Sequence, residues 1–390
     1  MAEGQGSLRS RGDGRPTWAE INLTALAANF RAIKDRVGPD IKVMAVVKAN
    51  AYGHGAIHCA RRLADEGADW FGVALPEEGV QLRSAGITQP ILCLGGFWEG
   101  QAPLCIQHKL VPAVFRLDLL EELDSAAKES GTPANVHLKV DTGMGRLGVR
   151  FDQVPEFIKV LAKFEHLHLD GVMTHFAAAD DPSCRPLTEQ QLQRFDEVLD
   201  LVRANGNEPT YRHLANSAAI FGEPGAWENM VRPGGILYGL WRDILPPAKE
   251  AVNLKPVMSL HSQIVLLKWV PAGETLGYGC TFEASRRTLV ATIPVGYEDG
   301  YLRGLSNRGH VLVRHTYAPV VGRISMDLTL IDVTNVPDVS LGDDVVLMGQ
   351  VRDQANNVLE IPAEDLARVA GTLSYEVTCG ISERVPRVYT

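Results

Sequence analysis

A lysine, Lys48, stands between the apolar run Ile41–Val47 and the turn Ala49-Asn50-Ala51-Tyr52-Gly53-His54-Gly55. A continuous apolar run is typical of a strand buried on both faces, and the end of such a strand holds a side chain rigidly. Burial lowers the pKa of a lysine, which makes its free amine available as a nucleophile or a base. A surface lysine is the commoner outcome after a generic strand. The two glycines, the tyrosine and the histidine crowded behind Lys48 favour a functional role.

Polar residues also accompany other apolar runs of the chain. They are Asp141–Gly148, His175, Asn216-Ser217 and Arg232-Pro233-Gly234-Gly235. A phosphate needs backbone N–H groups, hydroxyls and a helix N-terminus, which Ser217, Gly234 and Gly235 can supply. His175 could lie flat against an aromatic ring, and Arg232 could donate a hydrogen bond to a ring nitrogen without protonating it. Each group has an ordinary explanation alone, but together they indicate a site for an aromatic phosphate.

The spacing of apolar runs predicts how these residues are brought together. Eight short runs have the character of strands: Lys42–Val47, Phe71–Leu75, Ile91–Leu94, Val111–Phe115, Val136–Val140, Leu169–Thr174, Tyr211–Leu214 and Ile236–Gly239. Stretches of helical periodicity lie between them, most clearly Leu23–Val37, Ala56–Glu66, Asp118–Glu129, Val154–Phe164 and Thr188–Ala204. This alternation predicts an α/β fold with a (β/α)8 TIM-type barrel, whose functional residues gather where the strands end. A doubly wound open sheet is the alternative, although no Gly-x-Gly-x-x-Gly follows the first strand.

The character of the sequence changes after Lys255. Six runs rich in β-branched residues, separated by turn residues, predict a mostly antiparallel β domain: Val257–Val270, Thr288–Val295, His310–Arg314, Ala318–Gly322, Leu328–Val333 and Asp344–Met348. A last helix is expected around Pro362–Leu373. We therefore expect a disordered leader over residues 1–16, a barrel over 17–250 and a β-rich domain over 251–390.

Composition narrows the classes of partner. The chain has 390 residues and a net charge of -9 without basic runs, which argues against nucleic acid and anionic membranes. No apolar run is long enough to span a bilayer. The six cysteines form no C-x-x-C pair, so we expect free thiols in a reducing cytoplasm and no metal site.

The chain resembles the alanine racemases, which carry pyridoxal 5'-phosphate (PLP) on a lysine. The Lys48 string, the Asp141–Gly148 loop and two motifs of the second domain, Ile293–Gly300 and Gly322–Asp327, support the resemblance, which spans nearly everything after Pro16. It implies an enzyme that interconverts L- and D-alanine, supplying D-alanine for peptidoglycan. Racemisation needs a base on each face of the substrate, and the resemblance assigns these roles to Lys48 and to Tyr278 in the turn Gly277-Tyr278-Gly279, with the tyrosine acting on L-alanine.

Further roles follow from the same resemblance. The cofactor would be bound by Lys48, Tyr52, Arg146, His175, Asn216, Ser217, Arg232, Gly234, Gly235 and Tyr375, with the ring nitrogen facing Arg232. The substrate would contact Arg146, Met326 and Tyr297, and the supporting residues would be Lys139, Arg303 and Asp327. Lys139 matches a lysine that some members carry as a carbamate. The family forms a homodimer in which Tyr278 and Met326 of one chain complete the other chain's site.

Two positions depart from the family pattern, and three other readings stay open. Ser325 stands where cysteine is common, and Gly235 where a bulkier apolar residue is usual. A PLP-dependent decarboxylase with a barrel would place an acid, not Arg232, at the ring nitrogen. A non-catalytic PLP-binding protein would lack the β domain. A racemase of another small amino acid, such as serine, also stays open, because substrates that differ by so small a group are only weakly discriminated by a binding pocket.

Overall fold

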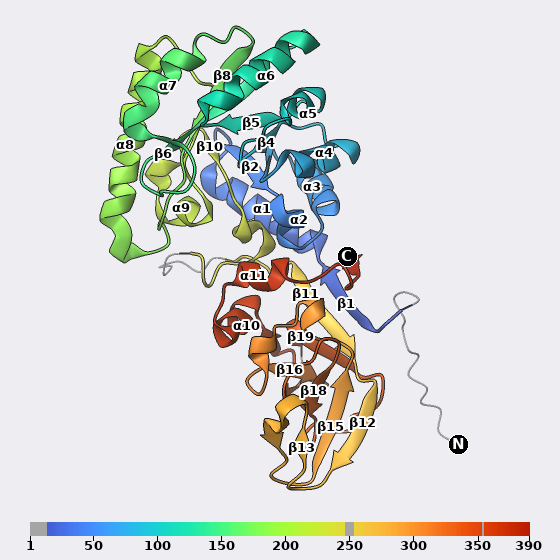
Figure 1. Cartoon of the computed structure of the whole chain (residues 1–390). Helices are drawn as coiled ribbons and strands as arrows, with labels where there is room; N and C mark the ends of the chain where they lie inside the picture. The colour runs from blue at the N-terminus through green and yellow to red at the C-terminus, as the bar shows by residue number, and fades with distance from the viewer. Residues whose placement is uncertain (1–13, 246–252, 353–354) are drawn as a thin grey trace. The chain divides into compact units, whose positions relative to one another are not determined.

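The structure is a computed structural model that describes residues 14–245, 253–352 and 355–390, and the chain divides into two compact units. The barrel unit comprises residues 24–255, and the β unit comprises residues up to Leu23 together with 256–390 (Figure 1). Most of the predicted leader, and the predicted boundary at residues 250 and 251, lie outside the described residues.

Parallel strands form the centre of the barrel unit. Within the described residues, eight of them follow the order β10-β2-β3-β4-β5-β6-β8-β9. Their bounds are β2 (Lys42–Val46), β3 (Trp70–Val73), β4 (Ile91–Cys93), β5 (Val111–Val114), β6 (Ala134–Asp141), β8 (Leu167–Met173), β9 (Tyr211–His213) and β10 (Met230–Val231). The short β7 (Val149–Arg150) pairs with β6. The edge strands β9 and β10 are linked by hydrogen bonds from Arg212 N to Asn229 Oδ1 (2.8 Å) and from Arg232 N to Ala215 O (2.9 Å), which nearly close the barrel.

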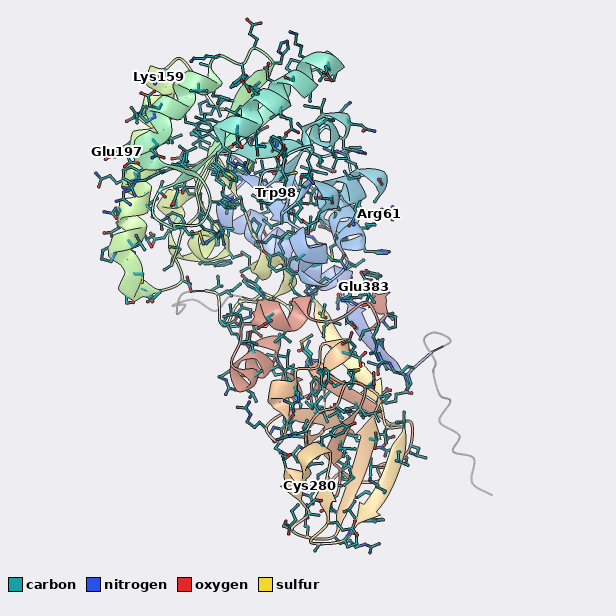
Figure 2. All side chains as sticks on the ribbon, in the orientation of Figure 1. Arg61, Trp98, Lys159, Glu197, Cys280 and Glu383 are labelled. Atoms are coloured by element: carbon teal, nitrogen blue, oxygen red, sulfur yellow. The ribbon has the colours of Figure 1, made fainter. Side chains whose placement is uncertain are left out.

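Helices surround these strands (Figure 1). They are α1 (Leu23–Val37), α3 (Ala56–Asp65), α4 (Pro76–Ser84), α5 (Ala102–Gln107), α6 (Leu117–Ser130), α7 (Val154–Leu161), α8 (Arg185–Ala204) and α9 (Ser217–Gly222). Helix α1 has the predicted bounds, because Leu26, Phe30, Ile33 and Val37 repeat on one face and are buried. Glu197 of α8 and Lys159 of α7 point away from the strands (Figure 2). This arrangement confirms the predicted α/β barrel over the doubly wound sheet.

The predicted eighth strand is wrong. Residues Ile236–Gly239 were expected to form it, but Gly235–Tyr238 form the 3-10 turn η4, and the eighth strand is β10. A short buried apolar run has no periodicity that separates a strand from a helical turn. Pro233 and two glycines end β10 at once, and Leu237 N bonds back to Gly234 O at 2.9 Å. Arg232 therefore follows the eighth strand instead of preceding it.

The β unit is mostly antiparallel, as predicted. One sheet has the order β17-β16-β19-β11-β1-β21 with β20 paired to β19, a second has β12-β15-β18, and a hairpin pairs β13 with β14. Their bounds are β1 (Thr17–Ile21), β11 (Met258–Gln263), β12 (Leu266–Val270), β13 (Thr275–Leu276), β14 (Phe282–Glu283), β15 (Thr288–Ile293), β16 (His310–Val313), β17 (Thr316–Pro319), β18 (Thr329–Asp332), β19 (Asp344–Arg352), β20 (Val358–Ile361) and β21 (Arg387–Tyr389). Helices α10 (Ala363–Ala370) and α11 (Ser374–Cys379) lie between β20 and β21 in the chain.

The strand β1 corrects the predicted domain limits. Residues 17–22 were assigned to the barrel, but Thr17–Ile21 pair with Met258–Ser262 in antiparallel register and with β21 in parallel register. The buried Thr17 hydroxyl bonds to the Ser262 hydroxyl at 2.9 Å and to Pro294 O at 2.9 Å. Because β1 follows the leader directly, its position in sequence gave no sign that its partners lie more than 200 residues away.

Candidate active site

Lys48 follows β2, separated from it by Val47, and begins a turn with unusual backbone geometry. Ala49, Asn50, Ala51 and Tyr52 all adopt the left-handed conformation, with φ between 52° and 55°. This conformation costs about 1–2 kcal/mol per residue for L-amino acids, so the surrounding structure must hold the turn in place. Asn50 Oδ1 accepts from Ala56 N at 2.8 Å, and Gly53 continues with φ 86°. Lys48 and Tyr52 are both half-buried, at the beginning and the end of this turn.

Glu78, which the sequence reasoning missed, fastens this turn to the next strand. Its Oε1 accepts from Ala49 N at 2.6 Å, and its Oε2 accepts from Ala74 N at 2.7 Å. The carboxylate therefore joins the residue after Lys48 to the loop after β3. Tyr238, also missed, donates its hydroxyl to Val46 O at 2.9 Å inside the barrel. No sequence signal marks either contact, because each joins segments that are adjacent only in the folded chain.

Tyr52, Ser217 and Gly234 form a cradle of polar groups. Gly234 N donates to Ser217 Oγ at 3.0 Å, and a Cβ on Gly234 would lie 2.5 Å from the Tyr52 hydroxyl. The next two N–H groups, of Gly235 and Ile236, open the turn η4 and bond to no described residue. The Asn216 carboxamide caps α9 by accepting from Ala219 N at 3.1 Å. Hydroxyls and open N–H groups at this point suit a phosphate.

Arg232 is buried and is held by neutral acceptors. Nη1 donates to His213 Nδ1 (2.8 Å) and His213 O (2.8 Å), while Nη2 donates to Thr174 O (2.7 Å) and Leu214 O (3.0 Å). Desolvation lowers the pKa of the guanidinium to about 9, which leaves it charged at neutral pH. Its fifth donor, Nε–H, makes no hydrogen bond within the described part of the chain. That N–H is the one a bound ring nitrogen could accept.

His175 follows β8 and lies 3.3 Å from Arg232 Nη2 through its Nδ1. Burial, followed by the positive charges around it, holds the pKa of His175 well below its usual value, so it is neutral. The charges that act on it are all cations: Arg232, Arg146, Lys139 and Lys48. The pKa of Lys139, buried in β6, is lowered to about 7 by burial and by three of the same cations. Its ammonium donates to Leu94 O at 2.7 Å.

Arg146 lies on the loop after β6. Asp141 Oδ1 accepts from Gly143 N (2.9 Å) and Gly145 N (3.0 Å), which shapes the loop. Gly148 has φ 132°, and a Cβ there would lie 2.5 Å from Asp141 N, so glycine is required. Arg146 itself is exposed and forms no ion pair with a described residue. The structure thus brings the predicted barrel residues to the ends of β2, β6, β8, β9 and β10, as the barrel rule predicts.

The remaining predicted residues lie in the β unit. Tyr278 sits in the β13–β14 hairpin and is 73% exposed, while Met326 and Tyr297 are 49% and 40% exposed. The loops of these residues are joined: Tyr297 N donates to Ser325 O at 3.0 Å, and Glu298 N to Met326 O at 3.2 Å. A Cβ on Gly279 would lie 2.7 Å from Arg323 Nη1, which fixes the backbone beside Tyr278. Cys280 marks this hairpin in Figure 2.

Three further predicted positions lie in the β unit: the supporting residues Asp327 and Arg303, and Tyr375, which is predicted to bind the cofactor. Asp327 accepts from Arg384 Nη2 at 2.7 Å. Arg303 is exposed in the short turn η7 (Arg303–Leu305), and Tyr375 is half-buried in α11.

Comparison with known proteins decides the family. The model of the alanine racemase N-terminal domain matches residues 21–241, and the model of the C-terminal domain matches residues 257–389. The chain belongs to the alanine racemase family. An alanine racemase from Geobacter sulfurreducens is 46% identical, with 97% of this chain and 98% of the relative covered. One from Halothermothrix orenii is 44% identical, with 96% of this chain and 97% of the relative covered.

Solved alanine racemases have the same fold. The enzyme from Streptomyces lavendulae superimposes with a TM-score of 0.88 at 37% identity, covering 97% of this chain and 98% of that one. The Bacillus anthracis enzyme with bound L-Ala-P gives 0.88 at 34% identity, covering 97% and 96%. Among the described residues, none of the helices is both long and apolar enough to cross a membrane.

The alanine racemase family depends on PLP, and the barrel unit fits this cofactor. The N–H groups of Gly235 and Ile236, with the Tyr52 and Ser217 hydroxyls, suit its phosphate. The charges of Arg232 and Arg146, which act on His175, suit its negative charge, and Arg232 Nε–H suits its ring nitrogen. Lys48 follows the strand end at which these groups meet.

Proposed function

We propose that the protein is a PLP-dependent alanine racemase that interconverts L- and D-alanine, with Lys48 and Tyr278 as its two bases. The observation that carries the proposal is Arg232, a buried cation whose partners are all neutral and whose Nε–H stays available. An arginine there can donate a hydrogen bond but keeps its own proton, so a ring nitrogen facing it stays neutral.

The chain's own residues account for proton removal on one face. PLP, when bound, supplies an aromatic ring that delocalises the electrons left when a substrate loses its α-proton. Lys48 Nζ takes or returns the proton on its own face of the substrate. The charge of Lys48 is among those that lower the pKa of His175 and of Lys139, so Lys48 lies within electrostatic reach of these two residues. Arg232 limits how strongly charge is drawn into the ring, which favours return of the proton over side reactions.

Tyr278 serves the opposite face. Its 73% exposure supports the proposal that the site is completed by a second chain, in a homodimer where Tyr278 and Met326 reach the partner's barrel. Hydrogen bonds between the Tyr297 and Met326 loops support their joint placement around the substrate. Arg303 and Asp327 would be supporting residues, and Tyr375 a further cofactor-binding residue. Lys139, carried as a carbamate, would support Arg146 by accepting its hydrogen bonds. Asn216 positions Ser217 by capping its helix.

The test is α-hydrogen exchange of L-alanine in heavy water, with the purified protein, added PLP and D-alanine measured in parallel. Deuterated alanine of both hands is the expected result. Exchange without formation of D-alanine would mean that the proton is removed and returned on one face of the substrate only, and would remove Tyr278 from the proposal. No exchange with alanine, but exchange with serine, would shift the substrate to another small amino acid.

The cellular role follows from the substrate. D-alanine formed by this reaction would supply peptidoglycan synthesis. The proposed cytoplasmic location is supported by the cysteines, which are free and of which Cys59, Cys93 and Cys105 are buried.

A further inference from the structure

Arg232 and two buried histidines form a chain of hydrogen bonds. His213, in β9, has its Nδ1 2.8 Å from Arg232 Nη1, and its Nε2 is 2.8 Å from Nδ1 of His137 in β6. Both imidazoles are fully buried. The proposed function uses Arg232 but gives no role to His137.

The arginine dictates which nitrogen of each histidine carries a hydrogen. A guanidinium only donates, so His213 Nδ1 must be a bare acceptor, and a neutral His213 then carries its hydrogen on Nε2. That N–H donates to His137 Nδ1, which must be bare in turn. His137 therefore carries its own hydrogen on Nε2. A second proton on either ring would set two N–H groups against each other, which agrees with the lowered pKa of His137, about 3.

The surroundings of His137 hold its ring for this contact. A Cβ on Gly171 would lie 2.7 Å from three atoms of the His137 ring, so only glycine leaves room at that point of β8. The Trp70 and Tyr211 rings lie 5.2 Å and 5.8 Å away between centroids. His137 Nε2 is buried and finds no hydrogen-bond partner among the described residues. A buried N–H without an acceptor destabilises the folded chain, and His137 nevertheless keeps the orientation in which its Nδ1 faces His213.

We propose that His137 is a positioning residue for Arg232, which acts by accepting the His213 Nε2–H and so fixing His213 Nδ1 as the arginine's acceptor. Donation from Nε2 also polarises the imidazole and strengthens Nδ1 as an acceptor. Without His137, His213 could move its hydrogen to Nδ1 and repel Arg232. The inference rests on the proposed function in one respect only, which is the role of Arg232 as the donor to the cofactor's ring nitrogen.

Two variants separate this role from simple packing. In His137→Asn, the side-chain oxygen can take the place of Nδ1 and still accept from His213. In His137→Leu, a side chain of similar size offers no acceptor. The holoenzyme, labelled with 15N-histidine, is measured by solid-state 15N NMR, with the His213 signals assigned by their loss in His213→Gln. Turnover of alanine and thermal stability are measured on the same preparations.

In the wild type and in His137→Asn, we expect His213 with bare Nδ1 and protonated Nε2. In His137→Leu, we expect that signature to be lost and kcat to fall about tenfold, a size typical of one broken buried hydrogen bond, while His137→Asn stays within about twofold of the wild type. Wild-type His213 protonated on Nδ1, or equal loss of kcat in both variants, would overturn the proposal. The spectrum needs no turnover, so failure of the racemase assignment is recorded separately.

Discussion

The Tyr52 hydroxyl lies over the Cα of Gly234, so closely that a Cβ on Gly234 would be 2.5 Å from the oxygen. The contact joins the left-handed turn after β2 to the residues that follow β10. It also explains a glycine whose own φ of -117° lies outside the left-handed region that only glycine favours. The close approach, not the backbone conformation, requires glycine.

Gly234→Ala should therefore weaken cofactor binding without unfolding the barrel. The added methyl group displaces the Tyr52 hydroxyl and opens the cradle formed with Ser217, which we expect to raise the PLP concentration for half-saturation about tenfold. Titration of the apoenzyme by absorbance measures it. Gly225→Ala, where a Cβ would meet nothing within 4 Å, is the control. Equal affinities in both variants would show that the contact does not shape the phosphate site.

Lys48→Ala should abolish racemisation, since it removes both the cofactor's attachment and one base. We expect turnover to fall by roughly 10³-fold or more. The visible absorption of protein-bound PLP should be lost as well. The control is Lys42→Ala at the start of β2, where an exposed lysine pairs with Asp69 Oδ1 at 2.9 Å. Substantial turnover in Lys48→Ala would assign the first base elsewhere.

The sequence was sufficient to predict those residues of the site that directly follow the strands of the barrel. Lys48, His175 and Ser217 follow apolar runs that became β2, β8 and β9, and the barrel rule then groups them. The left-handed turn after Lys48 was not predictable, because Ala49, Ala51 and Tyr52 have no preference for positive φ.

What the sequence missed depends on partners far along the chain. Glu78 has the local appearance of an acidic residue in the first turn of α4, yet its carboxylate joins two loops. Likewise, the apolar run Ile236–Gly239 predicts a strand, because burial on all sides makes a turn and a strand equally apolar. Only tertiary contacts distinguish these cases.

Tyr278→Phe should slow exchange from one enantiomer far more than from the other. Removing the hydroxyl takes away the base on one face, and the resemblance assigns that face to L-alanine, so L-to-D turnover should fall by about 10²- to 10⁴-fold. Deuterium exchange measured separately from each enantiomer reports it. Tyr317→Phe, which loses a surface contact to Glu360 O (3.0 Å), is the control. Equal loss from both enantiomers would refute the assignment of the face.

Lys139 should make stability depend on pH in a defined window. Its pKa is about 7 in the folded chain, against about 10.4 for an unperturbed lysine, so the unfolded chain binds more protons between these values. The free energy of unfolding therefore rises with pH across the window, and the penalty of the buried charge is complete below about pH 7. Lys139→Met should reduce that slope, as measured by urea unfolding in buffer free of carbon dioxide. An exposed lysine variant, Lys163→Met, should keep the wild-type slope.

A carbamate on Lys139 would relieve the same penalty. The ammonium first loses one proton, and the neutral amine then adds to carbon dioxide and releases a second, so a cation beside Arg146 and Arg232 becomes an anion. We therefore expect 13C-bicarbonate to give a protein-bound carbamate resonance and to raise the thermal midpoint of the wild type. Lys139→Met should show neither change. A wild-type protein without that resonance, or a refined crystal structure with an unbranched Lys139, would mean that the amine stays free and that Lys139 supports the site only through its bond to Leu94 O.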